Sequence, residues 1–398
     1  MAPMTAPESS KRPFLNRGLA SFGTTIFAEM SALAARTGSI NLGQGFPDTD
    51  GPAHIAEAAA RAVLTGLGNQ YPPGAGVPEL RGAIAAHQQR FYGLSYDPDT
   101  EVLVTAGATE AIAAALLALL EPGDEVIALE PFYDSYAACI AMAGAVRVPV
   151  TLRPHAGAFA LDPDELRAAV TPRTRLLLLN TPHNPTGTVL TPAELAAVAE
   201  LAVEHDLLVV TDEVYEHLVF EGAHTPLAGF PGMRERTVTI SSAGKTFSFT
   251  GWKVGWLTAP PELTAAVRSV KQFLTYVSSG PFQYAIAEAL ALPDSFYETF
   301  RADLAAQRNI LGDGLAAAGF EVYRPQGTYF ITTDIAPLGE HDGLAFCRAL
   351  PERCGVVAIP NQVFYDDKAA GATQVRWAFC KRPAVLHEAV ERLGRLTR

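Results

Sequence analysis

The sequence has 398 residues, 48% of them hydrophobic and only 18% charged, so the chain can bury a large core and disorder over most of its length is excluded. Its formal net charge is −12 and it has no clustered run of Lys or Arg, which argues against nucleic acid as a partner. The most apolar helical segment, 111–120, is about half as long as a membrane span, so we expect no membrane association.

In chain order, residues 1–45 are expected to form an arm that joins a smaller domain at the other end of the chain. Residues 46–293 alternate short apolar runs with longer segments of helical period. This alternation is typical of an α/β domain, in which helices cover both faces of a mainly parallel sheet. Seven strands are expected in that sheet, at 102–105, 126–129, 146–150, 176–179, 207–211, 238–240 and 255–258.

Capping residues mark two helix starts between these strands. Thr191 is followed by a proline and then by Glu194, which together form a capping box, and Asp162 and Glu165 repeat the pattern. From about residue 294 a long helical pattern precedes further strands at 327–332, 356–359 and 374–379. Residues 294–398 are therefore expected to form a smaller α+β domain.

The cysteines indicate buried free thiols rather than disulfides or metal ligands, because none has the CxxC spacing of a metal site. They are Cys139, Cys347, Cys354 and Cys380. The N-terminal segment has basic residues but no uninterrupted apolar stretch after them, unlike a secretory signal. The sequence therefore predicts a cytoplasmic protein without a metal site.

Polar residues follow the predicted strands, where the ligand of an open parallel sheet binds. Gly107, Ala108 and Thr109 come after the first strand and open a helix, whose free N–H groups favour a phosphate. An ordinary strand-to-helix turn has the same pattern. Ser242 and Lys253 are candidates for further phosphate contacts, through a hydroxyl and a positive charge.

Asp212 and Lys245 carry the strongest chemical indication. Asp212 ends an apolar strand, where an unpaired carboxylate is costly, so a cation such as a pyridinium N–H should face it. A salt bridge to a neighbouring arginine or a strand-end cap is the alternative. Lys245, in the turn after the next strand, would in isolation be a solvated loop charge. Because this turn lies at the same edge of the sheet, we expect a desolvated amine that can form an imine with an aldehyde.

Three more residues at this edge are candidates for contacts with an aromatic ring. Tyr215 follows Asp212 by three residues and can donate to a phenolic oxygen, with Asn184 as a second donor. Tyr133 can stack on the ring, although a half-buried core aromatic would have the same sequence context.

These residues lie within motifs that cover most of the chain. The motifs are NLGQGFPD at 41–48, NQYPPGAG at 69–76, EPFYDSY at 130–136, NTPHNPTG at 180–187, TDEVYEHL at 211–218, SSAGKTFSFTGWKVGW at 241–256, PQGTYF at 325–330 and VRWAFCK at 375–381. Their set and order resemble the fold-type I pyridoxal-phosphate aminotransferases of class I/II. Within that group the chain is most similar to the branch of the kynurenine/glutamine aminotransferases and the N-succinyldiaminopimelate aminotransferase.

The resemblance implies that Lys245 holds pyridoxal 5'-phosphate as a Schiff base and that Asp212 pairs with its ring nitrogen. Tyr215 and Asn184 would bond the ring oxygen, and Tyr133 would stack on the ring. The implied phosphate contacts are Gly107, Ala108, Thr109, Ser242, Lys253 and, from the second subunit of a homodimer, Tyr71.

For the substrate, the resemblance implies that Arg376 binds the α-carboxylate, helped by Asn184 and the backbone of Gly45. From the residues alone, Arg376 is equally well a structural ion pair. Phe27 and Tyr276 would line the side-chain pocket, the latter from the other subunit. Val277 stands where kynurenine-type enzymes often have histidine.

The expected activity is the transfer of an amino group between an L-amino acid and a 2-oxo acid by a ping-pong mechanism. N-succinyl-LL-2,6-diaminopimelate with 2-oxoglutarate is one expected pair. A kynurenine/glutamine-type activity with β-lyase action on cysteine conjugates is the alternative. A non-catalytic cofactor-binding regulator is disfavoured, because the chain has no room for a basic helix-turn-helix module of about 60 residues.

Overall fold

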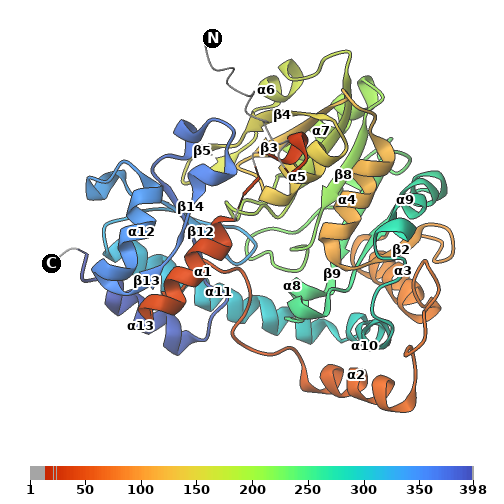
Figure 1. Ribbon diagram of the computed structural model, residues 1–398, viewed down its shortest axis with the longest axis horizontal. Coiled ribbons are helices and arrows are strands. Elements are labelled where there is room, and N and C mark those ends of the chain that lie inside the picture. Colours follow the sequence, from red (N-terminus) through yellow and green to blue (C-terminus); the bar gives the residue numbers. More distant parts are fainter. Residues whose placement is uncertain (1–13, 21, 24, 397–398) are drawn as a thin grey trace, which may run out of the picture.

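The computed structural model describes residues 14–396 except 21 and 24. Its larger half is built around a seven-stranded sheet, which Figure 1 shows with helices packed on it. The strand order is β2-β10-β9-β8-β7-β3-β4, and all neighbouring pairs are parallel except those made by β10. The strands are β2 (Val102–Thr105), β3 (Glu125–Glu130), β4 (Val146–Thr151), β7 (Thr174–Asn180), β8 (Leu208–Asp212), β9 (Thr237–Ser242) and β10 (Gly255–Thr258). The predicted mainly parallel sheet of seven strands is confirmed.

The sheet is buried on both faces, which explains why its strands are nearly continuous apolar runs. In β7, Leu176 and Leu178 pack under α4 (Gly107–Leu119), α5 (Asp134–Met142) and α9 (Pro261–Leu274). Leu177 and Leu179 point the other way, under α6 (Pro163–Ala168) and α7 (Pro192–Glu204). A third cluster joins the β2 edge to α2 (Ala53–Thr65), α3 (Pro78–Tyr92) and α10 (Gly280–Leu290).

The two predicted helix starts differ in their caps. At α7, the Thr191 hydroxyl and the Glu194 carboxylate form the full capping box. At α6, Asp162 accepts hydrogen bonds from the N–H groups of residues 164 and 165. Glu165 does not complete a second box, because its carboxylate instead accepts from the Thr151 N–H and from Arg153 of the short hairpin β5 (Arg153–His155) and β6 (Ala158–Ala160).

The smaller half contains the four-stranded sheet β11-β12-β15-β14 and three helices. Its elements are α11 (Asp294–Ala317), β11 (Glu321–Tyr323), β12 (Phe330–Asp334), α12 (Gly343–Cys354), β14 (Ile359–Pro360), β15 (Gln374–Ala378) and α13 (Pro383–Leu393). The strand expected at 327–332 was placed too early. It begins at Phe330, because Thr328 has a φ of 64°, a left-handed conformation that a strand does not tolerate.

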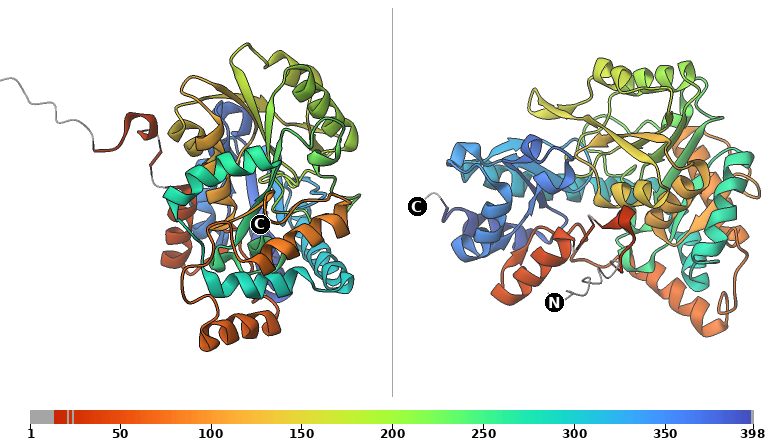
Figure 2. Two further views of the ribbon diagram at one scale, coloured as in Figure 1. Left: turned by 90° about the vertical axis from the view of Figure 1, so that its right-hand side faces the viewer. Right: turned by 45° about the horizontal axis from the view of Figure 1, so that its top comes forward.

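The N-terminal segment packs on the smaller half, where α1 (Ile26–Thr37) lies against the C-terminal elements (Figure 2). β1 (Ile40–Asn41) pairs in parallel with β13 (Val356–Val357). Residues 1–13 of the expected arm lie outside the described residues, and the domain boundaries stay a prediction. Within the part of the chain that the structure describes, no helix combines the length and apolarity that crossing a bilayer requires.

Candidate active site

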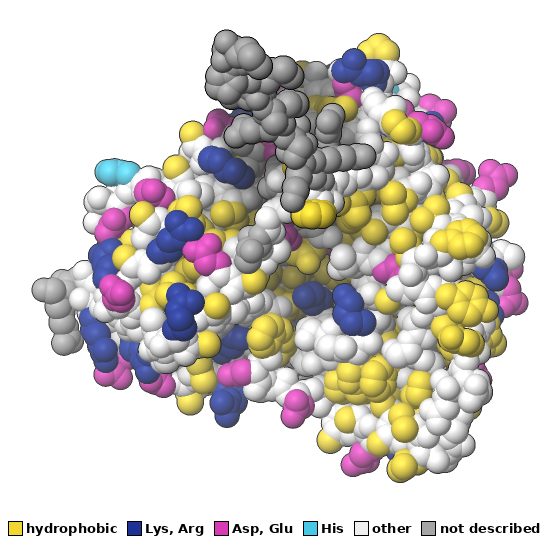
Figure 3. Space-filling view, viewed as in Figure 1, with side chains coloured by type: hydrophobic (Ala, Val, Ile, Leu, Met, Phe, Trp, Pro, Cys, Tyr) yellow, Lys and Arg dark blue, Asp and Glu magenta, His cyan; other side chains and the backbone are white. Residues whose placement is uncertain are grey.

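A cavity of about 180 Å³ lies at the carboxyl ends of the parallel strands. Its lining includes ten of the residues that the sequence singled out: Gly107, Ala108, Thr109, Tyr133, Asn184, Asp212, Tyr215, Ser242, Lys245 and Lys253. The space-filling view shows a hollow between the two halves, with Lys or Arg side chains exposed in it (Figure 3). The carboxyl ends of the strands thus bring together residues that lie up to 146 positions apart in the sequence.

One end of the cavity combines a helix N-terminus with a positive charge. Helix α4 begins at Gly107, whose φ is 78°, and a Cβ at this position would lie 2.9 Å from Nζ of Lys253. The positive φ favours glycine here, and the ammonium lies close over the first turn of the helix. Ser242 lies at the end of β9 on the same cavity wall. Free N–H groups, a hydroxyl and an ammonium are the donors that suit a phosphate group.

Asp212 lies on the floor of the cavity, at the end of β8, and is 5% exposed. Its Oδ2 accepts a hydrogen bond of 2.6 Å from the hydroxyl of Tyr136, and its Oδ1 accepts one of 3.3 Å from the Val214 N–H. Burial raises the pKa of this carboxyl to about 6. Among the described residues no arginine or lysine forms a salt bridge with it, so the arginine alternative is wrong.

Lys245 lies in the short helix α8 (Ala243–Thr246) and points into the cavity rather than into bulk solvent. Its Nζ donates a hydrogen bond of 3.0 Å to the hydroxyl of Tyr329. Burial lowers the pKa of this amine to about 8, an effect that the positive charges of Arg376 and Lys253 reinforce. A neutral amine is the nucleophilic form, so Lys245 is more reactive near neutral pH than a solvated lysine.

Asn184 connects the cavity to Arg376. The Asn184 side-chain oxygen accepts a hydrogen bond of 2.9 Å from Nη1 of Arg376, and Asn180 accepts one of 2.7 Å from the Asn184 N–H. Tyr215 and Tyr133 line the remaining walls, and burial raises the pKa of both hydroxyls, that of Tyr133 to about 12. Both tyrosines therefore remain hydrogen-bond donors at neutral pH.

Arg376 lies in β15 and is 1% exposed. Its Nη2 donates to the Gly43 carbonyl at 2.8 Å, and its Nε has no partner. The rings of Phe27 and Phe330 lie 5.1 and 4.0 Å from its guanidinium carbon. No carboxylate of the described residues is within salt-bridge distance, which excludes the structural ion pair. A buried guanidinium without a counter-charge is suited to an anionic ligand.

Tyr71 and Tyr276 lie outside this cavity. They are 81% and 54% exposed, and their rings meet edge to face at 5.5 Å. Gly45 also lies outside the lining, and its carbonyl accepts a hydrogen bond from the Tyr329 hydroxyl.

Thr250, which lines the cavity, was not predicted individually, and neither were three polar residues that hydrogen-bond to site residues: Tyr136, Asn180 and Tyr329. All three stand inside motifs that the sequence displays, one helical turn after Tyr133, at the end of β7 and just before β12. Tyr136 could have been found from its place in the first turn of α5, three residues after the N-cap Tyr133. The contact of Tyr329 with Lys245 spans 84 positions and has no local signal.

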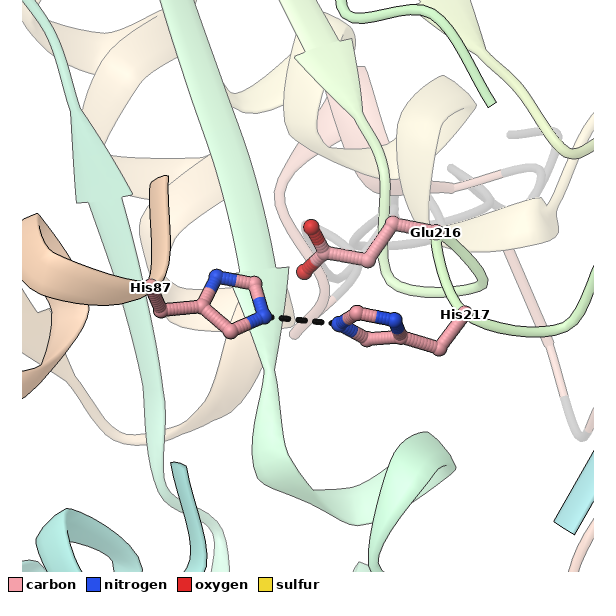
Figure 4. Close-up of side chains that lie close together, drawn as sticks. All are labelled: His87, Glu216 and His217. Atoms are coloured by element: carbon pink, nitrogen blue, oxygen red, sulfur yellow. Dashed lines mark hydrogen bonds between the residues drawn. The ribbon is translucent and has the colours of Figure 1, made fainter. Parts of the chain in front are cut away.

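A buried polar cluster was also not foreseen (Figure 4). Nε2 of His87 and Nε2 of His217 share a hydrogen bond of 2.7 Å, and a carboxylate oxygen of Glu216 lies within 4.8 Å of both. Two nitrogens bound to one tetrahedral zinc ion would be about 3.3 Å apart, so this spacing is that of a hydrogen-bonded pair. Glu216 also accepts from Ser241, which connects the cluster to β9 beside Ser242.

The fold and the cavity define an aminotransferase of fold type I that depends on pyridoxal 5'-phosphate. The cavity fits this group, because it offers a phosphate cradle at Gly107 and Lys253, a buried carboxylate without a cationic partner and a reactive amine. The chain belongs to the aminotransferase class I and II family, whose model matches residues 37–393.

Individual relatives agree with the family. A probable N-succinyldiaminopimelate aminotransferase of Mycobacterium tuberculosis is 57% identical, over 94% of this chain and 96% of its own. The solved structure of the N-succinyldiaminopimelate aminotransferase from that organism superposes with a TM-score of 0.94, at 56% identity, over 96% of this chain and all of the other. A methionine aminotransferase of Escherichia coli is 42% identical, over 95% of this chain and 97% of its own.

Proposed function

We propose that Lys245 holds pyridoxal 5'-phosphate covalently between turnovers and that its amine then moves the proton of the substrate α-carbon. The bound cofactor supplies an electron sink for the carbanion that this proton transfer creates. Asp212 keeps the ring nitrogen protonated, since a buried carboxylate favours a cation beside it. Tyr215 and Asn184 donate to the ring oxygen, and Tyr133 stacks on the ring.

In this proposal Arg376 holds the α-carboxylate of the amino acid. Support comes from its burial without an acidic partner and from the unsatisfied Nε, which leaves a donor free for an anion. Asn184 accepts a hydrogen bond from the same guanidinium, and the Gly45 carbonyl accepts one from Tyr329. An amino acid anchored there would have its α-carbon between Arg376 and Lys245, as the proton transfer requires.

We propose that the amino donor is N-succinyl-LL-2,6-diaminopimelate and the acceptor 2-oxoglutarate. The observation that carries this proposal is the 57% identity, over almost the whole of both chains, to the M. tuberculosis relative of that name. The shape of the molecule supports it. A second cavity of about 660 Å³ adjoins the site past Tyr133 and Phe27, and it is large enough for a long acylated side chain.

The substrate is tested with single half-reactions of the cofactor-loaded enzyme. Each amino acid is mixed with it rapidly, and the loss of the visible cofactor band gives kcat/KM. N-succinyl-LL-2,6-diaminopimelate is expected to react about 100-fold faster than methionine, glutamine or kynurenine, because only the long side chain fills the second cavity. A faster reaction of any of the three short donors would contradict the assignment while leaving the aminotransferase activity intact.

A kynurenine- or methionine-type activity is the second candidate. It is favoured by the 42% identity to the E. coli methionine aminotransferase and by 37% identity to a mouse kynurenine–oxoglutarate transaminase, over 92% of this chain and 87% of the relative. The aromatic ring of Phe27 at the second cavity would suit such donors. Release of pyruvate and ammonia from a cysteine conjugate, without a 2-oxo acid, would identify the accompanying β-lyase activity.

We propose that two copies of the chain share their active sites. Exposed apolar side chains gather near the ends of α2 and α9, at Leu64, Leu67, Tyr71, Phe273 and Tyr276. Figure 3 shows hydrophobic side chains collected over α2. Exposed apolar patches mark interaction surfaces, and in a symmetric dimer Tyr71 and Tyr276 of one subunit can reach the active-site cavity of the other.

Replacing Tyr71 with phenylalanine tests this arrangement. If the hydroxyl binds the phosphate in the partner's cavity, Tyr71→Phe should weaken cofactor binding about 10-fold, the effect of one hydrogen bond to a charged group. Titration of the cofactor-free protein measures this, and light scattering gives the mass. Tyr284→Phe, on α10, is the matched control and should bind normally. A monomeric protein, or unchanged affinity in Tyr71→Phe, would contradict the shared site.

The cytoplasm is the proposed location. All four cysteines are free and buried, as the sequence predicted, which is compatible with a reducing compartment.

A further inference from the structure

A hydrogen-bonded chain crosses from the larger half of the molecule to the smaller half through the catalytic lysine. Nζ of Lys245 donates to the Tyr329 hydroxyl at 3.0 Å, and that hydroxyl donates to the carbonyl of Gly45. Tyr329 has no exposed surface and directly precedes β12. Nothing in the proposed roles of Lys245 or Gly45 requires this tyrosine, although it is the only described side chain that hydrogen-bonds the lysine amine.

The direction of the two hydrogen bonds is fixed by their partners. The Gly45 carbonyl can only accept, so the phenolic proton points toward it and the oxygen lone pairs remain for the N–H of Lys245. Burial raises the pKa of the Tyr329 hydroxyl well above its usual value of 10, so the group stays protonated. Tyr329 therefore acts as an acceptor toward Lys245 and does not take its proton.

The surroundings of Gly45 hold this arrangement in place. A Cβ at Gly45 would overlap the ring of Phe330, so the backbone of Gly45 packs closely against that ring. The ring of Tyr329 is fixed by edge-to-face contacts with Tyr215 and Phe330, at 5.3 and 4.8 Å between centroids. An acceptor that is itself immobile can orient its donor.

A neutral amine has one lone pair and two hydrogens. When one N–H of Lys245 is donated to Tyr329, the lone pair and the second hydrogen take the two positions directed away from that oxygen, and Lys245 lines the same cavity as Asp212, Tyr215 and Asn184. We propose that Tyr329 is a positioning residue, which directs the lone pair of the Lys245 amine toward the substrate α-carbon. This inference rests on the proposed role of Lys245 in moving the α-proton.

Tyr329→Phe tests the inference, because it removes the acceptor and keeps the ring contacts. We expect kcat to fall about 10- to 100-fold, the effect of a misdirected group, with KM for both substrates nearly unchanged. The kinetic isotope effect with an α-deuterated amino acid should increase, because proton transfer becomes slower than the other steps. A loss of stability alone would not change this isotope effect.

A second measurement needs neither cofactor nor turnover. Competitive amine labelling of the cofactor-free protein over a pH series, read peptide by peptide by mass spectrometry, gives the pKa of Lys245. Asp212, Arg376, Lys253 and Cys380 also act on this amine and are unchanged in the variant. Loss of an acceptor destabilises the charged form, so the pKa should be lower in Tyr329→Phe than in the wild type.

Tyr365→Phe is the matched control. Tyr365 is equally buried, and its hydroxyl donates to Gln374 at 2.8 Å, away from Lys245. This control should keep the wild-type kcat, isotope effect and lysine pKa. Wild-type values for kcat and the isotope effect in Tyr329→Phe, or equal losses in the control, would overturn the inference.

Two outcomes separate this inference from the proposed function. A wild-type enzyme that transfers no amino group would refute the function, and the labelling experiment would still show whether Tyr329 contacts the amine. Should Tyr329→Phe fail to fold, a crystal structure of the cofactor-free wild type decides the question. A Lys245 amine beyond hydrogen-bond reach of Tyr329 would then overturn the inference.

Discussion

Lys245→Ala is expected to lower kcat by about 10⁴-fold, the upper range for loss of a general acid–base group. The variant loses both the covalent attachment of the cofactor and the base beside the α-carbon. It should still bind pyridoxal 5'-phosphate through Gly107, Ser242 and Lys253. Steady-state assays measure the rate, and mass spectrometry after borohydride reduction measures the covalent link.

Lys368→Ala provides the matched control, because Lys368 is an exposed lysine that donates to backbone carbonyls outside the cavity. It should retain the link and the rate. A small amine such as methylamine is expected to restore part of the activity of Lys245→Ala, since it can occupy the space of the missing side chain. Full turnover by Lys245→Ala without added amine would refute the assignment of the catalytic lysine.

Asp212→Asn has the second largest expected effect, a fall in kcat/KM of about 10³-fold. The amide would present an N–H to the ring nitrogen, whereas the carboxylate would accept a hydrogen bond from it, so residue 212 would no longer hold that nitrogen in the protonated form that serves as an electron sink. The variant keeps a side chain of the same size, and its oxygen can still accept from Tyr136. Stopped-flow half-reactions measure the loss.

Tyr136→Phe separates the charge of Asp212 from its surroundings. The hydrogen bond from Tyr136 lowers the pKa of Asp212, which burial otherwise raises. Its removal should therefore raise that pKa and shift the acidic limb of the pH profile of the half-reaction to higher pH, with little change at the plateau. An Asp212→Asn enzyme as active as Tyr136→Phe would contradict the role given to the carboxylate.

The sequence was sufficient to predict the main sheet because its strands are buried on both faces. Runs such as residues 176–179 are apolar without interruption, since alternate leucines pack into different clusters. The same topology places strand ends at one edge, which is why Asp212 and Lys245 could be paired before their positions were known. Local sequence patterns are enough to predict which residues meet when each residue follows a parallel strand of the same sheet.

Other contacts could not be predicted because they depend on how the two halves meet. Tyr329 contacts Lys245 from a position between Thr328, whose φ is 64°, and the start of β12, where the sequence predicted regular strand. The Arg376 contact with the Gly43 carbonyl joins segments 333 positions apart. Tyr71 and Tyr276 were assigned by resemblance alone, and a single chain leaves them at its surface.

The reversed direction of β10 places two lysines of the site on one hairpin. Ser242 pairs with Gly255 and Ser241 with Trp256, so the loop between β9 and β10 returns to the edge from which it left. Lys245 follows the end of one strand and Lys253 precedes the start of the other. Slippage of this hairpin by one residue would move Lys245 and Lys253 together. A single pairing register therefore sets the two strand ends beside which both lysines, the proposed contacts of the cofactor, lie.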